Sequence, residues 1–123
     1  MISIIDDDDS VRESLQRLMR SVGLAVNVFA SAEEFLNSDR LRYTDCLILD
    51  VRLPGMNGFD LQRHLANSHS EIPIIFITSH EDDELRARAL NGGAVDYLLK
   101  PFNNEDLLDA IDEALKSKVD GKK

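Results

Sequence analysis

The side chains best suited to chemistry in this sequence stand directly after short apolar runs. Asp50 closes one such run, and Pro54 and Gly55 follow it closely, so a central strand has to stop there. Three other apolar runs also end in polar groups, which gives the set Asp6 and Asp7, Asp50, Thr78, and Lys100. Carboxylates are ligands that Mg²⁺ prefers, and an ammonium group can neutralise a phosphoryl oxygen. The set therefore predicts a site for magnesium and a phosphoryl group.

These residues can meet only if the apolar runs are strands of one parallel sheet. Short apolar runs alternate with segments whose apolar residues recur at helical spacing, which is typical of a parallel sheet covered on both faces. Open α/β sheets bind ligands at the edge formed by the carboxyl ends of their strands. We expect an α/β fold of five strand–helix units, with strands over residues 2–5, 25–29, 47–50, 74–77 and 97–99.

Capping residues predict where the helices begin and end. The first helix is expected to begin after the aspartate run at residues 6–9 and to end at Gly23. Ser31, with Glu34 three residues later, predicts a short helix that opens with a capping box. Asn103 is the expected cap of the last helix.

Composition restricts the class of protein. The 123 residues fit one domain, with 43% hydrophobic and 30% charged residues, as in ordinary globular proteins. A formal net charge of −9 argues against direct binding to nucleic acid or to an anionic membrane surface. The sequence contains no apolar stretch near the roughly 20 residues needed to span a bilayer and no signal peptide. Its single cysteine, Cys46, lies in an apolar run and is expected in the core. These features predict a cytoplasmic protein.

Four segments in order resemble the signatures of response-regulator receiver domains of the CheY-like superfamily: IIDDD at 4–8, LDVRLPGMNG at 49–58, ITS at 77–79 and KPF at 100–102. The segments SVRESL at 10–15 and GGAVDY at 92–97 are most similar to the FixJ/NarL-type branch. The resemblance implies a flavodoxin-like (βα)5 three-layer sandwich with strand order 2-1-3-4-5. It also implies a receiver domain over residues 1–117, followed at 118–123 by a polar tail or the start of a linker.

The resemblance assigns a role to each site residue. Asp50 would be the phosphoacceptor, and Lys100 would contact a phosphoryl oxygen. Asp7 and Asp50 would bind Mg²⁺ directly, together with the backbone carbonyl of Arg52, while Asp6 would orient a metal-bound water.

Further residues are expected to report or control phosphorylation. Thr78 would donate its hydroxyl to the phosphoryl group, and Tyr97 would turn inward when Thr78 moves. Ser79 is a small residue that would leave the site accessible, and His80 is expected at the site entrance. The switch would change a surface formed by the helix at residues 82–91, the fifth strand and the last helix.

The expected function is that of a two-component response regulator receiver. A sensor histidine kinase would donate the phosphoryl group, and output would pass through dimerisation or partner binding, including transcription control if an effector domain is attached. One alternative is a haloacid-dehalogenase-type phosphatase, although Arg52 stands where that family has a second aspartate. Another is a pseudo-receiver that acts as an interaction module without phosphorylation.

Overall fold

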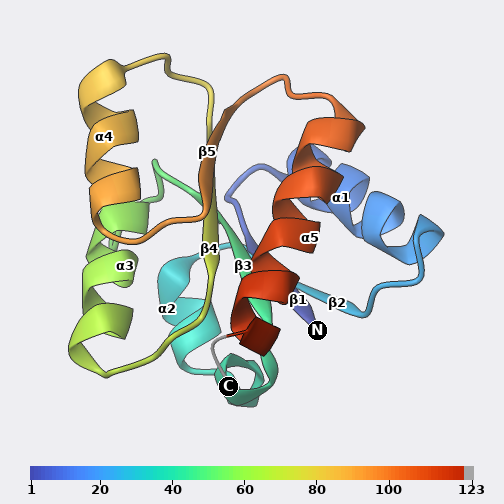
Figure 1. Cartoon of the computed structure of the whole chain (residues 1–123), viewed down its shortest axis with the longest axis horizontal. Coiled ribbons are helices and arrows are strands. Elements are labelled where there is room, and N and C mark those ends of the chain that lie inside the picture. The colour runs from blue at the N-terminus through green and yellow to red at the C-terminus, as the bar shows by residue number, and fades with distance from the viewer. Residues whose placement is uncertain (121–123) are drawn as a thin grey trace.

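The computed structural model describes the backbone of residues 1–120 and the side chains of residues 1–116. In this part of the chain, five parallel strands form one sheet in the order β2-β1-β3-β4-β5, with helices on both sides (Figure 1). The elements are β1 (Ile2–Ile5), α1 (Asp9–Ser21), β2 (Val26–Phe29), α2 (Ala32–Leu36), the 3-10 helix η1 (Asp39–Tyr43), β3 (Cys46–Asp50), α3 (Gly58–Asn67), β4 (Ile74–Thr78), α4 (Asp83–Asn91), β5 (Asp96–Leu99) and α5 (Asn104–Asp120). This architecture confirms the predicted flavodoxin-like fold and its strand order.

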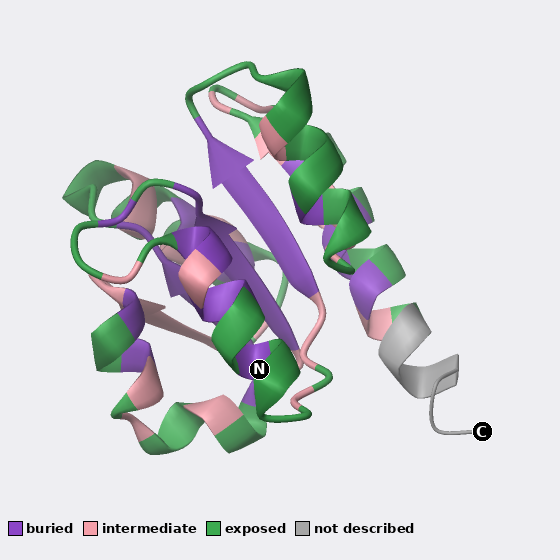
Figure 2. Cartoon of the chain, turned by 90° about the vertical axis from the view of Figure 1, so that its left-hand side faces the viewer, coloured by how far each residue is buried: buried purple, intermediate pink, exposed green. Residues whose placement is uncertain are grey.

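Two apolar clusters hold the three layers together. Helices α1 and α5 pack on one face of the sheet through side chains such as Leu15, Met19 and Ile111. The cluster on the other face includes Phe35 of α2 and Phe59 of α3. Strands β1, β3 and β4 are buried along their whole length, as the purple strands in Figure 2 show. Cys46 is fully buried at the start of β3, as the sequence predicted.

The strand register brings the predicted site residues to one edge of the sheet. Ile5 lies beside Leu49, Asp50 beside Ile77, and Thr78 beside Leu99. The residues that follow these strands therefore emerge together at the carboxyl end, where Asp6, Asp7, Asp50, Thr78 and Lys100 are found.

Helix α1 begins earlier than the sequence analysis predicted. It starts at Asp9, inside the aspartate run, because Asp8 acts as the N-cap. The carboxylate of Asp8 accepts hydrogen bonds from the amides of Ser10 at 2.8 Å and Val11 at 3.3 Å. Aspartate is a strong N-cap residue, so the run itself supplies the cap. The helix ends as expected, with Gly23 at a φ of +79° directly after its C-cap.

The capping box at α2 is only half formed. Ser31 accepts a hydrogen bond from the amide of Glu34 at 3.1 Å, but the Glu34 carboxylate accepts from the amide of Ala30 instead of that of Ser31. A complete capping box, which the sequence analysis did not predict, joins Asn57 and Asp60 at the start of α3. The 3-10 helix η1 was not predicted either.

The last helix is capped as predicted, since the amide of Asp106 donates to the side chain of Asn103 at 2.7 Å. It continues to Asp120, across the expected domain boundary between residues 117 and 118. The rest of the predicted polar tail, residues 121–123, lies outside the described residues. Among the helices that are described, none combines the length and the apolar character needed to cross a membrane.

Candidate functional site

The site centres on an ammonium group placed between two buried carboxylates. Lys100 follows β5 and donates a hydrogen bond to Asp6 at 2.7 Å and to Asp50 at 3.4 Å. Asp6 is fully buried, and Asp50 is 6% exposed. Charges this deeply buried are stable only when they are paired and hydrogen-bonded. Asp6, Asp50 and Lys100, three of the five residues predicted to meet at the sheet edge, therefore do so.

A third carboxylate opens this cluster to solvent. Oxygen atoms of Asp6, Asp7 and Asp50 all lie within 4.8 Å of one another, and Asp7 is exposed. The amide of Asp8 donates to Asp6 at 2.9 Å and helps to fix its orientation. This donor set fits Mg²⁺, which prefers oxygen ligands and keeps several of its waters. Three carboxylates and one ammonium also leave the cluster negative when all are ionised, which favours a bound cation.

The pKa of Asp50 reflects this crowded environment. Burial, followed by repulsion from the negative charge of Asp6, raises the pKa of Asp50 to about 6. The charge of Lys100 and a hydrogen bond from the amide of Arg52, at 3.2 Å, act in the opposite direction. Burial alone would lower the pKa of Lys100, but its hydrogen bond to Asp6 and the charges of Asp50 and Asp6 raise it instead. Lys100 is therefore held in its charged form.

The loop between β3 and α3 is fixed by close packing at both ends. A Cβ atom added to Gly58 would lie 2.5 Å from the backbone oxygen of Asp50 and 3.0 Å from the Cα atom of Val51. Glycine is therefore required where α3 approaches the end of β3. Farther along the loop, the carboxylate of Glu33 accepts a hydrogen bond from the amide of Met56 at 2.9 Å. Sequence reasoning missed Glu33, because this contact joins segments 23 residues apart.

Thr78 and Tyr97 both contact the segment that follows β4. The buried hydroxyl of Thr78 accepts a hydrogen bond from the amide of His80 at 3.2 Å. Tyr97 is turned inward, 2% exposed, and its hydroxyl donates to the backbone oxygen of His80 at 3.5 Å. Burial raises the pKa of Tyr97, although hydrogen bonding with Thr78 acts against this shift. Ser79 and His80 themselves are exposed beside the site.

Two arginines attach α4 to its neighbours through contacts that the sequence did not reveal. Arg86 donates to the backbone oxygen of Tyr97 at 3.0 Å, and its guanidinium lies 5.5 Å from the centre of the Tyr97 ring. The guanidinium of Arg88 lies 4.4 Å from the centre of the Phe59 ring on α3. Both arginines are exposed. They leave α4 joined to β5 and α3 by polar and cation–π contacts at its surface.

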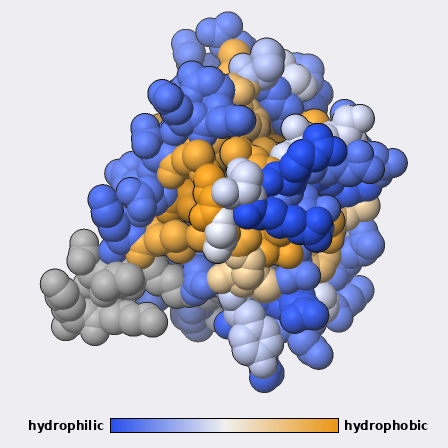
Figure 3. Space-filling model, turned by 90° about the vertical axis from the view of Figure 1, so that its right-hand side faces the viewer, coloured by the Kyte–Doolittle hydropathy of each residue, from blue (hydrophilic) through white to orange (hydrophobic). Residues whose placement is uncertain are grey.

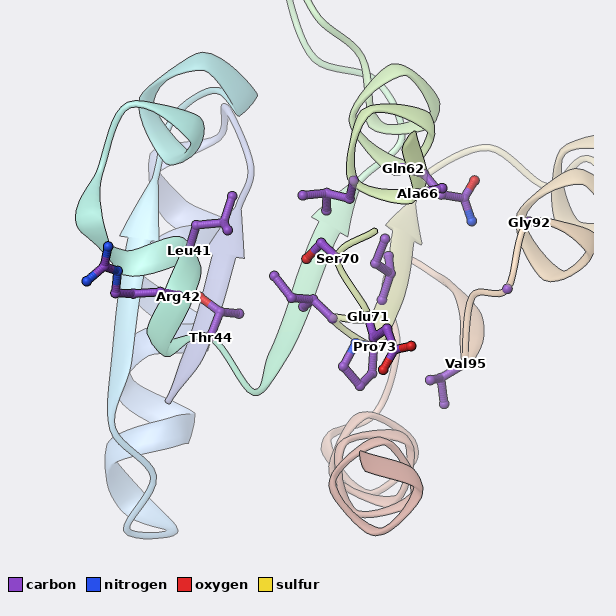
Figure 4. A pocket seen from close by; sticks show the side chains of 14 residues that line it. Leu41, Arg42, Thr44, Gln62, Ala66, Ser70, Glu71, Pro73, Gly92 and Val95 are labelled. Atoms are coloured by element: carbon purple, nitrogen blue, oxygen red, sulfur yellow. The ribbon is translucent and has the colours of Figure 1, made fainter. Parts of the chain in front are cut away.

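Two cavities lie at opposite ends of the molecule. One of about 590 Å³ lies beside the acidic cluster and is lined by Asp7, Arg52 and Arg88, among others. The other, of about 550 Å³, lies between η1, the end of α3 and the turn after α4, where Gln62 and Gly92 are close together (Figure 4). The second cavity contains none of the predicted site residues. The chemistry therefore belongs to the first.

Residues 2–112 match the response regulator receiver domain family. The chain belongs to this family. Nodulation protein W of Bradyrhizobium diazoefficiens is 52% identical over 111 residues, which cover 90% of this chain and 49% of the relative. Response regulator protein TmoT of Ectopseudomonas mendocina is 51% identical over 116 residues, which cover 94% of this chain and 53% of the relative. The chain thus spans about half the length of these curated relatives.

Solved structures give the same assignment. The response regulator StyR has a TM-score of 0.91 and 43% identity, with 98% of this chain and 61% of the StyR chain covered. FixJ-N has a TM-score of 0.83 and 36% identity, with 94% of this chain and 92% of that chain covered. The predicted resemblance to receivers, with FixJ among the relatives, is confirmed. The receiver domain takes part in two-component signalling, and the phosphatase alternative is set aside.

Proposed function

We propose that Asp50 accepts a phosphoryl group from the phosphohistidine of a sensor kinase. The observation that carries this assignment is the position of its carboxylate, at the edge of the sheet, 3.4 Å from Lys100 and within the acidic cluster. An oxygen of Asp50 forms a bond to phosphorus while the phosphorus–nitrogen bond of the donor breaks. The imidazole leaves with the bonding electron pair and then takes up a proton.

Lys100 and Asp6 prepare this step before any donor arrives. The carboxylate of Asp6 holds the Lys100 ammonium at 2.7 Å, next to the oxygen atoms that a phosphoryl group would occupy. A positioned charge of this kind stabilises charge that develops during transfer without a cost of reorganisation. Lys100 thus neutralises one phosphoryl oxygen, while Asp6 fixes where that charge lies.

The acidic cluster fits Mg²⁺, which would supply additional positive charge against the phosphoryl oxygens. We assign the direct contacts to Asp7, Asp50 and the backbone carbonyl of Arg52. Asp6 already accepts a hydrogen bond from Lys100, so it would orient a metal-bound water instead of binding the ion directly. Asp7 lies on the exposed side of the cluster, where an entering ion would meet it first.

The same residues support loss of the phosphoryl group. Attack of a water oxygen on phosphorus would break the oxygen–phosphorus bond and regenerate the Asp50 carboxylate. Ser79 and His80 are exposed next to Thr78, so they border the path by which this water enters. The domain would therefore catalyse its own phosphorylation and dephosphorylation as a signalling device, with no metabolic product.

The switch would run from Thr78 to Tyr97 and then to α4. Thr78 contacts the amide of His80, and Tyr97 contacts the carbonyl of the same residue. Movement of Thr78 toward a phosphoryl group would disturb both contacts. Because Arg86 joins the backbone of Tyr97 to α4, the change would reach the surface formed by α4, β5 and α5. The proposed output is dimerisation, or recruitment of a partner, through this surface. In a protein as long as the curated relatives, the change would act on an attached effector domain.

Labelling with a small phosphodonor tests the assignment. Incubation with acetyl phosphate and Mg²⁺ is expected to add one phosphoryl group to the wild type and none to Asp50→Asn, as measured by intact-mass spectrometry. Asp45→Asn, which changes an aspartate outside the cluster, should be labelled like the wild type. Equal labelling of the wild type and Asp50→Asn would show that another residue is the nucleophile. Absence of labelling in every protein would favour the pseudo-receiver alternative.

A further inference from the structure

A carboxylate on α2 restrains the loop that leads away from Asp50. This loop covers residues 51–57 and joins β3 to α3. Glu33, in the first turn of α2, accepts a hydrogen bond from the amide of Met56 at 2.9 Å. The bond joins the loop to an element outside it, so it limits the positions that the loop can take.

The backbone of the loop is shaped to receive this carboxylate. Gly55 has a φ of +72°, which residues with a Cβ atom rarely adopt. A Cβ atom at this position would lie 2.6 Å from Oε2 of Glu33, the same oxygen that accepts from Met56. Glycine therefore allows both the turn and the close approach of the carboxylate.

Other contacts fix the two ends of the loop. The amide of Arg52 donates to the side chain of Asp50 at 3.2 Å, and the amide of Gly58 donates to the carbonyl of Val51 at 3.0 Å. Between these ends, residues 54–55 are exposed, so side-chain packing does little to hold them. The bond to α2 therefore restrains the part of the loop that the end contacts leave free.

The hydrogen bond between Glu33 and the loop is made by an ionised acceptor. Donation from the amide of Met56, followed by donation from the amide of Glu33 itself, lowers the pKa of the Glu33 carboxylate. An ionised carboxylate is a stronger acceptor than a neutral oxygen. The restraint is therefore present at neutral pH.

We propose that Glu33 is a positioning residue for the magnesium site. The inference rests on the proposed function, in which the backbone carbonyl of Arg52 binds Mg²⁺. This ion demands a nearly ideal octahedral geometry, so a carbonyl carried by a wandering loop would bind it less tightly. Glu33 holds the loop in place before the ion arrives, which reduces the ordering that binding requires. It acts through the loop and is not part of the acidic cluster.

Isothermal titration calorimetry with Mg²⁺ alone tests the proposal without a phosphodonor. Glu33→Ala should weaken Mg²⁺ binding about threefold to tenfold, which corresponds to the loss of one hydrogen bond. Glu33→Gln should bind Mg²⁺ nearly as well as the wild type, because its amide oxygen can still accept from Met56.

Two control variants separate this contact from a general loss of negative charge. Glu34→Ala removes an exposed carboxylate from the same helical turn, one that accepts from the amide of Ala30 and not from the loop. Glu113→Ala does the same on α5, which packs on the opposite face of the sheet, on the side of the molecule that Figure 3 shows. Both variants should bind Mg²⁺ like the wild type.

Gly55→Ala provides an independent check, because its Cβ would push the Glu33 carboxylate away from Met56. This variant should also weaken Mg²⁺ binding. Adding Glu33→Ala to it should cause a further loss of less than about twofold, since the contact is already broken. A full additional loss in the double variant would overturn the proposal.

Acetyl-phosphate labelling distinguishes positioning from damage to the fold. Glu33→Ala should be labelled more slowly than the wild type at low Mg²⁺ and at the same rate at saturating Mg²⁺. A deficit that persists at saturating Mg²⁺ would overturn the proposal. If Glu33→Ala lowers the melting temperature but binds Mg²⁺ with wild-type affinity, the proposal is overturned and the proposed function stands. A wild type that binds no Mg²⁺ would overturn both the inference and the metal assignment.

Discussion

Asp50 combines two properties that oppose each other in the metal-free domain. Its burial and the nearby charge of Asp6 make ionisation unfavourable, yet an ionised carboxylate is the form that binds a cation and attacks phosphorus. The pKa near 6 means that Asp50 is mostly ionised at neutral pH, but its ionisation lowers the stability of the fold. A cation bound beside Asp50 would offset this loss of stability, because its positive charge favours the ionised carboxylate.

Asp50→Asn should therefore stabilise the metal-free domain at high pH. The folded-state pKa of about 6 lies above the ordinary value of 3.8, so ionisation of Asp50 destabilises the fold above pH 6. The folded domain gains stability from protonation of Asp50 as the pH falls from about 6 toward 4, and it loses that stability as the pH rises again. The variant should gain on the order of 1–2 kcal/mol in free energy of unfolding at pH 8, with the difference disappearing near pH 4.

Urea denaturation in the presence of a chelator measures this difference. Glu113→Gln, which removes an exposed carboxylate on α5, serves as the control and should show no such pH-dependent gain. A variant less stable than the wild type at pH 8 would mean that Lys100 outweighs burial and Asp6 in the balance at Asp50.

Mg²⁺ should raise the melting temperature of the wild type, because an ion that binds only the folded state stabilises it by mass action. The gain is about 2.7 kcal/mol at a hundredfold excess over the dissociation constant. Asp7→Asn should lose most of this response, and the exposure of Asp7 makes it suitable for substitution without damage to the core. Thermal melts with and without the ion provide the measurement. Asp109→Asn should respond like the wild type, and a full response by Asp7→Asn would exclude Asp7 as a ligand.

At the scale of elements, the site depends on how closely α3 approaches the end of β3. Gly58→Ala should reduce the free energy of unfolding by about 1–3 kcal/mol, since its Cβ would lie 2.5 Å from the backbone oxygen of Asp50. To relieve this clash α3 and the end of β3 have to move apart, and this movement should slow acetyl-phosphate labelling of Asp50. Gly23→Asn is the matched control, because Gly23 has open space around it and asparagine tolerates its positive φ. If Gly58→Ala unfolds and labels like the wild type, the approach is less restrictive than the geometry indicates.

Local patterns predicted the elements whose signals are local. Apolar runs that end in polar residues identified β1, β3 and β4, and hence the meeting of Asp6, Asp50 and Lys100. The start of α1 was predicted too late because Asp8 could serve either as part of an acidic loop or as a cap. The contacts of Glu33 and of Arg86 join segments distant in sequence, so no short pattern contains them. The inward position of Tyr97 depends in the same way on packing around the finished sheet.

At the scale of the whole molecule, activation should change self-association through α4, β5 and α5. Beryllium fluoride, a mimic of the acyl phosphate, should increase the mass measured by light scattering, with a coupling free energy of about 1–3 kcal/mol. Tyr97→Ala should reduce the response because it removes the ring beside Arg86.

Tyr43→Ala is the matched control for this experiment, since Tyr43 is an exposed tyrosine on η1. Tyr43→Ala should respond to beryllium fluoride in the same way as the protein that retains Tyr43. Hydrogen exchange across residues 82–100 provides a second measurement of the same change. If neither the mass nor the exchange responds to beryllium fluoride, the proposed switch surface is incorrect.

The sequence distance between Asp6 and Lys100 also bears on synthesis at the ribosome. These two residues are 94 positions apart, although their side chains share a hydrogen bond. The chain is synthesised from its N-terminus, so β1 and β3, which pair in the folded domain, are both translated long before β5. A nascent chain therefore contains its aspartates long before it contains the ammonium group of Lys100. Under the proposed function, the growing chain acquires the capacity to take up a phosphoryl group only once Lys100 can join Asp6 and Asp50.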